Sequence, residues 1–231
     1  MLWSVASLDG GRGFKLIPGR FPPVRHFAHL AHERDWDTLD SILAMTDDQA
    51  RDEIGQIELV PANGRYDGRH AVQVMTAFTS FNPAGSRFSD GSYGVFYLQL
   101  TREDAISEAR SEASAFLGAT KERPIKLRLG LYSVGLAGNA ADLRNVEAIR
   151  RESAASDTWK ESRALGMRLR AEGMTGILYP SANAQSEDSL ALFKASALTD
   201  CVRDALVELN WDGRAIDSVT ILSDSPESAD A

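Results

Sequence analysis

The chain has 231 residues, of which 43% are hydrophobic and 25% charged, so it is long enough to bury a sizeable core. Its net charge of -8 at pH 7 argues against direct binding of nucleic acid or of an anionic membrane, and it suits a small-molecule enzyme or a basic protein partner. The one cysteine, Cys201, excludes an internal disulfide and a zinc–cysteine cluster.

The first residues are expected to contribute little regular structure. Residues 1–14 are predicted to be an irregular N-terminus, and residues 10–23, rich in glycine, arginine and proline, an irregular lead-in. The start of the chain lacks the basic and apolar regions of a secretion signal, and no apolar run approaches the roughly 20 residues of a membrane span. We therefore expect a cytoplasmic protein.

The next part of the chain predicts two helices and a strand. Asp35 or Asp37 can cap a helix that extends to about residue 54. Residues 57–60 are a short strand candidate that a proline ends, and residues 70–78 a short helix.

The centre of the chain predicts a strand followed directly by a capped helix. Alternation over residues 94–100 puts Tyr97 on one face of the strand. Thr101 caps the helix, with Asp104 three residues later as a variant of the capping box. Glu108 lies beside the buried stripe of this helix and can therefore point into a cleft. The stripe consists of Ala105, Ala109, Ala113, Phe116 and Leu117.

The C-terminal half predicts mostly strands. One helix, capped by Asp157 and ending near Gly173, has Leu165 and Leu169 on its apolar face. Asp212-Gly213 is typical of a hairpin turn. Alternating or short apolar runs predict strands at residues 125–131, 175–179, 190–193, 206–211 and 215–222.

These elements predict one domain. No internal repeat or linker separates them, so we expect a mixed α/β domain over residues 15–222, with a central mixed sheet flanked by helices. Residues 223–231 contain only Ser, Asp, Glu, Pro and Ala and predict an acidic disordered tail.

A polar, glycine-rich loop that precedes the central strand is the main candidate for a site. Its Arg87 is interpreted either as a surface loop arginine in an ion pair or as a clamp for a phosphate or carboxamide group. Neighbouring glycines and serines, among them Ser89, favour the clamp, although neither a P-loop nor a Rossmann motif is present. Tyr97 and Glu108, taken singly, fit a core aromatic and a solvated helix residue. Together, the cation, the ring and the carboxylate can bind a dinucleotide and stabilise a ribosyl cation.

Two further features have weaker interpretations. Ser181 follows a predicted strand as a loop residue, and no Gly-x-Ser-x-Gly elbow marks it as a hydrolase nucleophile. His26, His29 and His32 are spaced by three, which fits a metal site or a partly exposed helix. The HxxHE pattern matches no zinc-protease motif and favours the helix, so no metal is expected.

Taken together, these segments resemble the RES-domain family, which is named for an arginine, a glutamate and a serine. The resemblance extends over about residues 15–220, and Ser181 stands where the family has its serine. The central matches are Gly85-Ser86-Arg87-Phe88-Ser89, Tyr97-Leu98 and Ala105-Ile106-Ser107-Glu108. The resemblance implies an ADP-ribosyltransferase-like fold and an NAD-degrading toxin of a toxin–antitoxin pair. It also implies an Xre-type antitoxin that covers the active site, often in a larger hetero-oligomer, and a homo-oligomer stays open.

The resemblance also implies roles for the candidate residues, with NAD as the substrate and no metal. Glu108, Arg87 and Tyr97 would be catalytic, and Arg87, Ser89, Tyr97 and Ser181 would bind NAD. Glu108 would stabilise the ribosyl cation, Arg87 would clamp a phosphate or the carboxamide, and Tyr97 would stack on nicotinamide. Water, phosphate or a protein side chain stays open as the acceptor.

The chain departs from the family pattern at two places. Arg110 and its neighbours stand where the family commonly has a histidine, and an acidic segment with Glu187 and Asp188 replaces a glycine-rich turn. The acidic segment favours one alternative, a catalytically silent RES-like binding module. A second alternative is transfer of ADP-ribose to a protein.

Overall fold

The structure is a computed structural model of the chain, and it describes residues 3–18, 57–80, 82–151, 159–181 and 188–223. The strands are β1 (Ser4–Ser7), β2 (Arg12–Pro18), β3 (Phe96–Gln99), β4 (Ile125–Leu136), β5 (Asn139–Asp142), β6 (Gly176–Pro180), β7 (Asp188–Leu192), β8 (Leu198–Trp211) and β9 (Ile216–Ser223). The helices are α3 (Ala71–Thr79), α4 (Arg102–Thr120), α5 (Glu147–Arg151) and α6 (Lys160–Ala171), and short 3-10 turns lie at Ile57–Leu59, Ala62–Gly64 and Ala195–Ala197.

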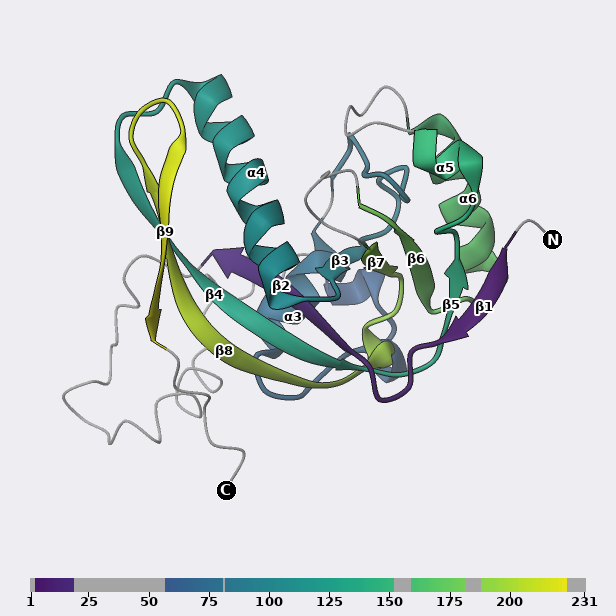
Figure 1. Cartoon of the computed structure of the whole chain (residues 1–231). Coiled ribbons are helices and arrows are strands. Elements are labelled where there is room, and N and C mark those ends of the chain that lie inside the picture. The colour runs from purple at the N-terminus through teal and green to yellow at the C-terminus, as the bar shows by residue number, and fades with distance from the viewer. Residues whose placement is uncertain (1–2, 19–56, 81, 152–158, 182–187, 224–231) are drawn as a thin grey trace.

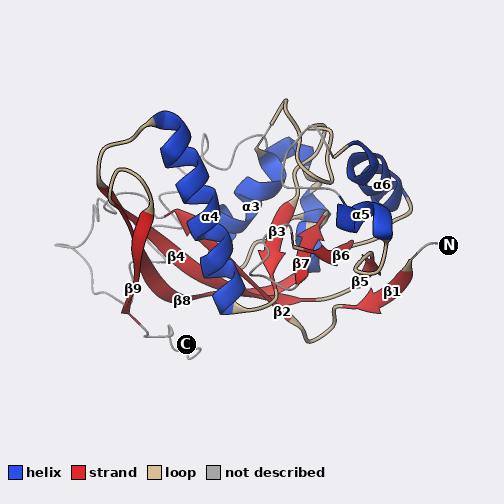
Figure 2. Ribbon diagram, turned by 45° about the horizontal axis from the view of Figure 1, so that its top comes forward, coloured by secondary structure: helices blue, strands red, loops and turns tan. Residues whose placement is uncertain are grey.

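The nine strands form one sheet in the order β1-β5-β6-β7-β3-β2-β4-β8-β9 (Figure 1). The neighbours β5 and β6 pair in parallel, whereas β6 and β7, and β4 and β8, pair antiparallel. The sheet is therefore mixed, and helices lie against it (Figure 2). The predicted fold class, mixed α/β with a central mixed sheet flanked by helices, is confirmed.

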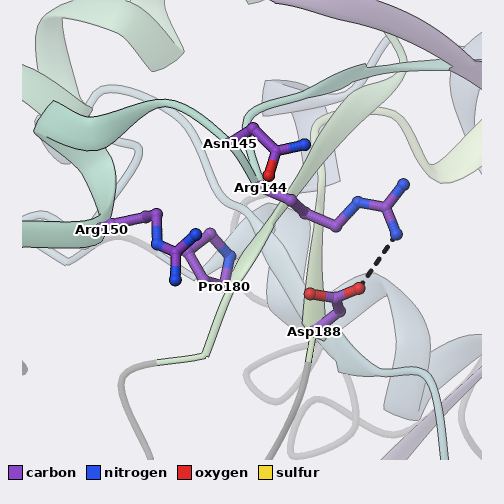
Figure 3. A pocket seen from close by; sticks show the side chains of 5 residues that line it. All are labelled: Arg144, Asn145, Arg150, Pro180 and Asp188. Atoms are coloured by element: carbon purple, nitrogen blue, oxygen red, sulfur yellow. Dashed lines mark hydrogen bonds and ion pairs between the residues drawn. The ribbon is translucent and has the colours of Figure 1, made fainter.

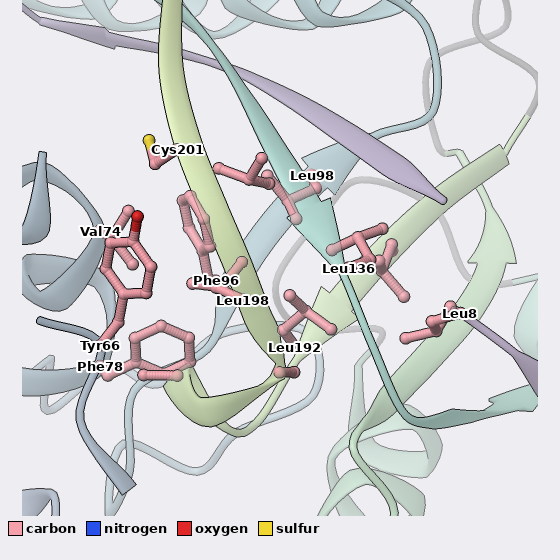
Figure 4. Packing of buried hydrophobic residues seen from close by; sticks show 14 of the residues in the cluster. Leu8, Tyr66, Val74, Phe78, Phe96, Leu98, Leu136, Leu192, Leu198 and Cys201 are labelled. Atoms are coloured by element: carbon pink, nitrogen blue, oxygen red, sulfur yellow. The ribbon is translucent and has the colours of Figure 1, made fainter. Parts of the chain in front are cut away.

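Three hydrophobic clusters assign the helices to the two faces of the sheet. On one face, α3 packs through Val74, Met75 and Phe78 against Phe96 and Leu98 of β3 (Figure 4). On the other face, α4 packs through Ala105 and Leu117 on one side, and α5 and α6 pack through Ile149 and Leu169 on the other. The cluster of α5 and α6 also contains Tyr97 and Tyr179.

The central strand alternates as predicted. Phe96 and Leu98 belong to the α3 cluster, whereas Val95 and Tyr97 belong to the α5–α6 cluster. Because successive side chains of a strand point to opposite faces, Tyr97 and Gln99 lie on the face that carries α4, α5 and α6. The predicted helices at residues 70–78 and after Thr101 and the hairpin at Asp212-Gly213 are likewise confirmed.

The N-terminal residues are not irregular as predicted, because they form β1 and β2. Strand β2 lies inside the sheet and pairs along its whole length with β4. A Cβ atom on Gly13 would come within 2.9 Å of the Leu98 side chain, and Arg12 forms an ion pair of 2.6 Å with Asp200. Gly13 thus leaves room for Leu98 of the neighbouring β3, and Arg12 reaches across β4 to Asp200 of β8.

Two smaller predictions are also wrong. Residues 57–60 form a 3-10 turn, and the Arg65 guanidinium donates to the carbonyl oxygens of Ile57 and Val60, which a neighbouring strand would otherwise bind. Phe116, predicted to be buried, is 66% exposed, because at this end of α4 it is Leu117 that faces the sheet and packs in the α4 cluster.

Several predictions concern residues outside the described ranges. These are the helix that ends near residue 54, the His26, His29 and His32 segment, the Asp157 cap and the tail beyond Ser223. Within the described residues, no helix is long and apolar enough to cross a membrane.

The cap of α4 gives a first test of the local structure. The Thr101 hydroxyl accepts a hydrogen bond from the Asp104 backbone N–H at 3.1 Å and donates one to the Asp104 carboxylate at 2.7 Å. We expect Thr101→Ala to lower the free energy of unfolding by about 1 kcal/mol, because it leaves an N-terminal amide of the helix without its side-chain acceptor. Urea denaturation measures the change. Thr101→Ser keeps the hydroxyl and serves as the control, so an equal loss in both variants would contradict the role of the cap.

Candidate functional site

The loop before β3 is held in shape by its own side chains. Gly85 and Gly91 have φ angles of +70° and +99°, which favour glycine. The Ser89 hydroxyl donates to the Tyr93 carbonyl oxygen at 2.6 Å and accepts from the Gly91 amide at 3.0 Å. Ser89, which we predicted to bind NAD, is 2% exposed and organises the loop.

Helix α6 fixes this loop from the side. The Arg163 guanidinium donates to the carbonyl oxygens of Ala84 at 2.8 Å and Ser86 at 3.0 Å. Farther along the helix, Gly166 packs so closely on the loop that a Cβ atom there would clash with the Phe88 carbonyl oxygen. The loop that carries Arg87 is therefore positioned by a helix that lies about 75 residues later in the chain.

Arg87 is buried, with 6% of its surface exposed, so the interpretation as a surface ion pair is wrong. Its Nη2 donates to the Ile149 carbonyl oxygen at 2.9 Å, and its Nη1 donates to the Pro180 carbonyl oxygen at 3.4 Å. Its guanidinium carbon lies 5.0 Å from the centre of the Tyr179 ring, within the range of a cation–π contact. Arg87 thus connects the loop to α5 and to the end of β6.

Tyr97 connects the central strand to the same loop. Its hydroxyl donates to Ser86 Oγ at 2.7 Å and accepts from the Phe88 amide at 3.1 Å. Burial raises the pKa of Tyr97, so its hydroxyl stays protonated at neutral pH. The side chain is half-buried on the face that carries α4 and α6.

Tyr179 of β6 is the point where the predicted residues meet. Burial raises the pKa of Tyr179 most, the negative charge of Glu108 raises it further, and the positive charge of Arg87 lowers it. Arg87 lies 5.0 Å from this ring and Tyr97 packs in the same cluster, so both are neighbours of Tyr179, and the carboxylate of Glu108 is near enough for its charge to act on the ring. The sequence predicts only a strand at Tyr179 and gives no sign of these neighbours.

The floor between α4 and α6 is polar. On β3, Gln99 accepts a hydrogen bond of 2.8 Å from the Ser189 hydroxyl of β7, and both residues are buried. Ser189 also hydrogen-bonds Tyr179 and thereby lowers its pKa. These side chains share the face of Tyr97, so the site has a polar floor in an otherwise apolar layer.

Glu108 and Ser181 come from a helix and from the residue after a strand. Glu108 is half-buried on α4, one turn after the buried Ala105. Ser181 is half-buried and directly follows Pro180, whose carbonyl oxygen binds Arg87. Ser181 follows Tyr179 by two residues, and Glu108 is near enough for its charge to raise the pKa of Tyr179.

A pocket of about 480 Å³ adjoins the end of β6 (Figure 3). Its lining residues come from the segment after β5, from α5 and from the facing ends of β6 and β7, and they are Arg144, Asn145, Arg150, Pro180 and Asp188. Arg144 bridges two carboxylates, at 2.7 Å to Asp142 and 3.0 Å to Asp188. Asp188, one of the two acidic residues that depart from the family pattern, thus has its charge offset by an arginine.

The Arg144 bridge predicts a pH dependence. The hydrogen bond from Arg144 holds the pKa of Asp142 below its ordinary value of 3.8. A lowered folded-state pKa stabilises the protein above the unfolded value, and this contribution is lost as the pH falls through the folded value. We expect Asp142→Asn to be destabilised relative to wild type near neutral pH and the difference to shrink at about pH 3. Urea midpoints at both pH values check this, and a constant difference would contradict it.

Metal ligands do not gather in the described residues. Within residues 3–18, 57–80, 82–151, 159–181 and 188–223, no three His, Cys, Asp or Glu side chains lie close enough together to hold a metal ion. The histidines considered above lie outside these ranges.

Comparison with known proteins decides the family. A RES-domain family model matches residues 63–212, which is more than half of the chain. The chain belongs to the RES-domain family. The match starts after β1 and β2, although both strands are part of the sheet.

Two individual proteins resemble this RES-domain chain. The uncharacterized protein y4oC of Sinorhizobium fredii (strain NBRC 101917 / NGR234) is 26% identical over 212 residues, which cover 92% of this chain and 88% of that protein. A chain in the crystal structure of the MbcT–MbcA toxin–antitoxin complex of M. tuberculosis is 18% identical, with a TM-score of 0.33, over 56% of this chain and 67% of that one.

Proposed function

We propose that this RES-domain protein degrades NAD by cleaving the bond between nicotinamide and ribose. The observation that carries the proposal is the convergence of Arg87, Tyr97 and Glu108 on Tyr179. They come from a loop, a strand and a helix. The Arg87 guanidinium carbon lies 5.0 Å from the centre of the Tyr179 ring, and Tyr97 packs in the same hydrophobic cluster as Tyr179. The negative charge of Glu108 raises the pKa of Tyr179. A cation, an aromatic ring and a carboxylate around one polar floor are what the reaction requires.

The proposed reaction needs little acid catalysis. The nicotinamide of NAD is a cationic leaving group, so the C–N bond breaks with its electron pair going to the ring nitrogen, and neutral nicotinamide leaves. The remaining ribose resembles an oxocarbenium ion, as in glycoside hydrolysis. Water then adds through its oxygen to the same carbon and loses a proton, which gives ADP-ribose. Phosphate can take the place of water in the same step.

The residues have distinct proposed roles. Glu108 stabilises the developing positive charge and holds a ribose hydroxyl, because its carboxylate is half-buried beside the floor. Tyr97 offers its ring to the nicotinamide, and Ser181 donates a hydrogen bond. Arg87 gives two of its five N–H donors to the Pro180 and Ile149 carbonyl oxygens and would bind the carboxamide or a phosphate with the others. Ser89 would support NAD binding indirectly by holding the loop in shape, since its hydroxyl bonds only the Tyr93 carbonyl oxygen and the Gly91 amide of that loop.

We further propose that the protein is the toxin of a toxin–antitoxin pair in the cytoplasm. Its partner would be an Xre-type antitoxin that covers the site, as resemblance to the RES-domain family implies. The net charge of -8 supports a partner with a basic surface. Coexpression with a candidate antitoxin tests this: the pair should copurify, and the antitoxin should block NAD loss.

The test of the chemistry is product analysis with NAD labelled in its adenylate part. Hydrolysis gives free nicotinamide and labelled ADP-ribose, and phosphorolysis gives a labelled phosphate ester only when phosphate is present. Label retained on protein would replace this proposal with ADP-ribosyl transfer. No loss of NAD with or without phosphate would leave a silent binding module, an alternative that the ion pair between Asp188 and Arg144 already weakens.

A further inference from the structure

The pocket beside β6 has the size of a small-ligand site. Its volume of about 480 Å³ lies within the range of about 300–1,000 Å³ that is usual for such sites. Figure 3 shows side chains from the segment after β5 on one side and Asp188 of β7 on another, with Pro180 beside Arg150. The residues that surround it are mostly polar or charged.

The two arginines of the pocket differ in their partners. Arg144 is held by the carboxylates of Asp142 and Asp188, which fix its position and offset its charge. The exposed side chain of Arg150 has no ion-pair partner within the part of the chain that the structure describes. Arg150 and the neutral amide of Asn145 therefore supply the donors that the pocket can offer to an anion.

The pocket adjoins Arg87 through the backbone. The guanidinium of Arg87 binds the carbonyl oxygens of Ile149 and Pro180. Ile149 directly precedes Arg150, and Pro180 lines the pocket. One Arg87 donor thus binds a residue that lines the pocket, and another binds the residue before Arg150, so Arg87 positions the segment that carries Arg150.

We propose that this pocket binds the diphosphate of the dinucleotide, with Arg150 as the main anion-binding side chain and Asn145 as a second donor. This inference rests on the proposed function and extends it. It gives a binding site to the diphosphate, the part of NAD that extends away from the nicotinamide ribose beside Tyr179. The exposed Arg150 side chain would bind the phosphate oxygens. Arg144 is held between the carboxylates of Asp142 and Asp188 and only lines the pocket.

The test uses full-length protein that carries Glu108→Gln. Calorimetry measures how tightly it binds ADP-ribose, adenosine and inorganic phosphate. In this background the binding of unreacted NAD can also be measured. Arg150→Gln removes the charge, Arg150→Lys keeps it, and Arg214→Gln, on an exposed residue of the β8–β9 turn, is the matched control. We expect Arg150→Gln to lower the affinity for ADP-ribose and for NAD about tenfold or more, because a charge-assisted hydrogen bond to phosphate is lost.

Three further outcomes define the result. Adenosine, which has no phosphate, should bind both forms equally, Arg150→Lys should recover part of the affinity, and Arg214→Gln should bind like the parent. If Arg150→Gln lowered the affinity for inorganic phosphate but not for ADP-ribose, the pocket would bind phosphate as the acceptor of the reaction, and the proposal would be overturned. So would unchanged ADP-ribose affinity in Arg150→Gln, or no binding of ADP-ribose at all. A failure of NAD cleavage with the binding effect intact would overturn the proposed function instead.

Discussion

Glu108→Gln is expected to lower the turnover of NAD by about 10²- to 10³-fold, because in the proposed reaction the carboxylate that stabilises the developing ribosyl cation becomes neutral. The substitution keeps the size of the side chain. Glu108 is only half-buried on α4, so the fold should remain. Turnover is measured as the release of free nicotinamide, which chromatography quantifies. Thermal unfolding confirms that the variant is folded.

Glu112→Gln is the matched control for this experiment. Glu112 lies one turn farther along the same helix, and its side chain is 60% exposed, with its carboxylate 3.8 Å from the Lys15 ammonium. The same loss of charge there should leave turnover within about twofold, since exposed ion pairs contribute little. Equal activity of the two variants would contradict a catalytic role for Glu108.

Gly166→Ala is expected to destabilise the protein by about 1–3 kcal/mol, the usual cost of forcing extra volume into a packed interior. A Cβ atom at this position would clash with the carbonyl oxygen of Phe88, which is backbone and cannot simply turn away. Helix α6 and the loop would have to separate, and Arg87 would move with the loop. We therefore expect weaker NAD binding in addition to a lower free energy of unfolding.

Gly118→Ala on α4 separates this contact from the general effect of glycine in a helix. A Cβ atom there would lie 3.9 Å from the Trp211 ring, an ordinary contact. This variant should gain up to about 1 kcal/mol, because alanine favours the helix over glycine. Urea denaturation of both variants provides the comparison. Stabilisation in both would show that α6 does not press on the loop.

Local signals in the sequence were enough to predict the parts of the site that lie close together in the chain. Thr101 and Asp104 predicted the start of α4, and alternation predicted the face on which Tyr97 lies. Both depend on near neighbours and on fixed periods of side-chain direction. Glu108 followed from the helix and from its place beside the buried stripe.

Contacts between distant segments were not predictable in this way. The roles of Gly13 and of Gly166 depend on Leu98 and Phe88, which lie far away in the sequence. In the same way, burial of Arg87 depends on carbonyl groups of α5 and β6. The sequence does not distinguish a glycine that leaves room for a side chain of the next strand from a glycine that forms a turn. The residues of β2 were therefore predicted to be irregular.

Tyr179 was missed for a related reason. Its neighbours in the sequence predict only a strand, and its importance arises from the pairing of β6 with β7, which brings it to Ser189. The alternation of Ile177 with Tyr179 on one face was the available signal, but it could not reveal which residues face that side from β3 and α4.

The most direct test of the account is a crystal structure of the Glu108→Gln variant with NAD bound. The account predicts the nicotinamide ribose within hydrogen-bond distance of residue 108, the nicotinamide ring against Tyr97, and the diphosphate beside Arg150. NAD bound with its nicotinamide ribose away from the polar floor of Gln99, Tyr179 and Ser189 would contradict it.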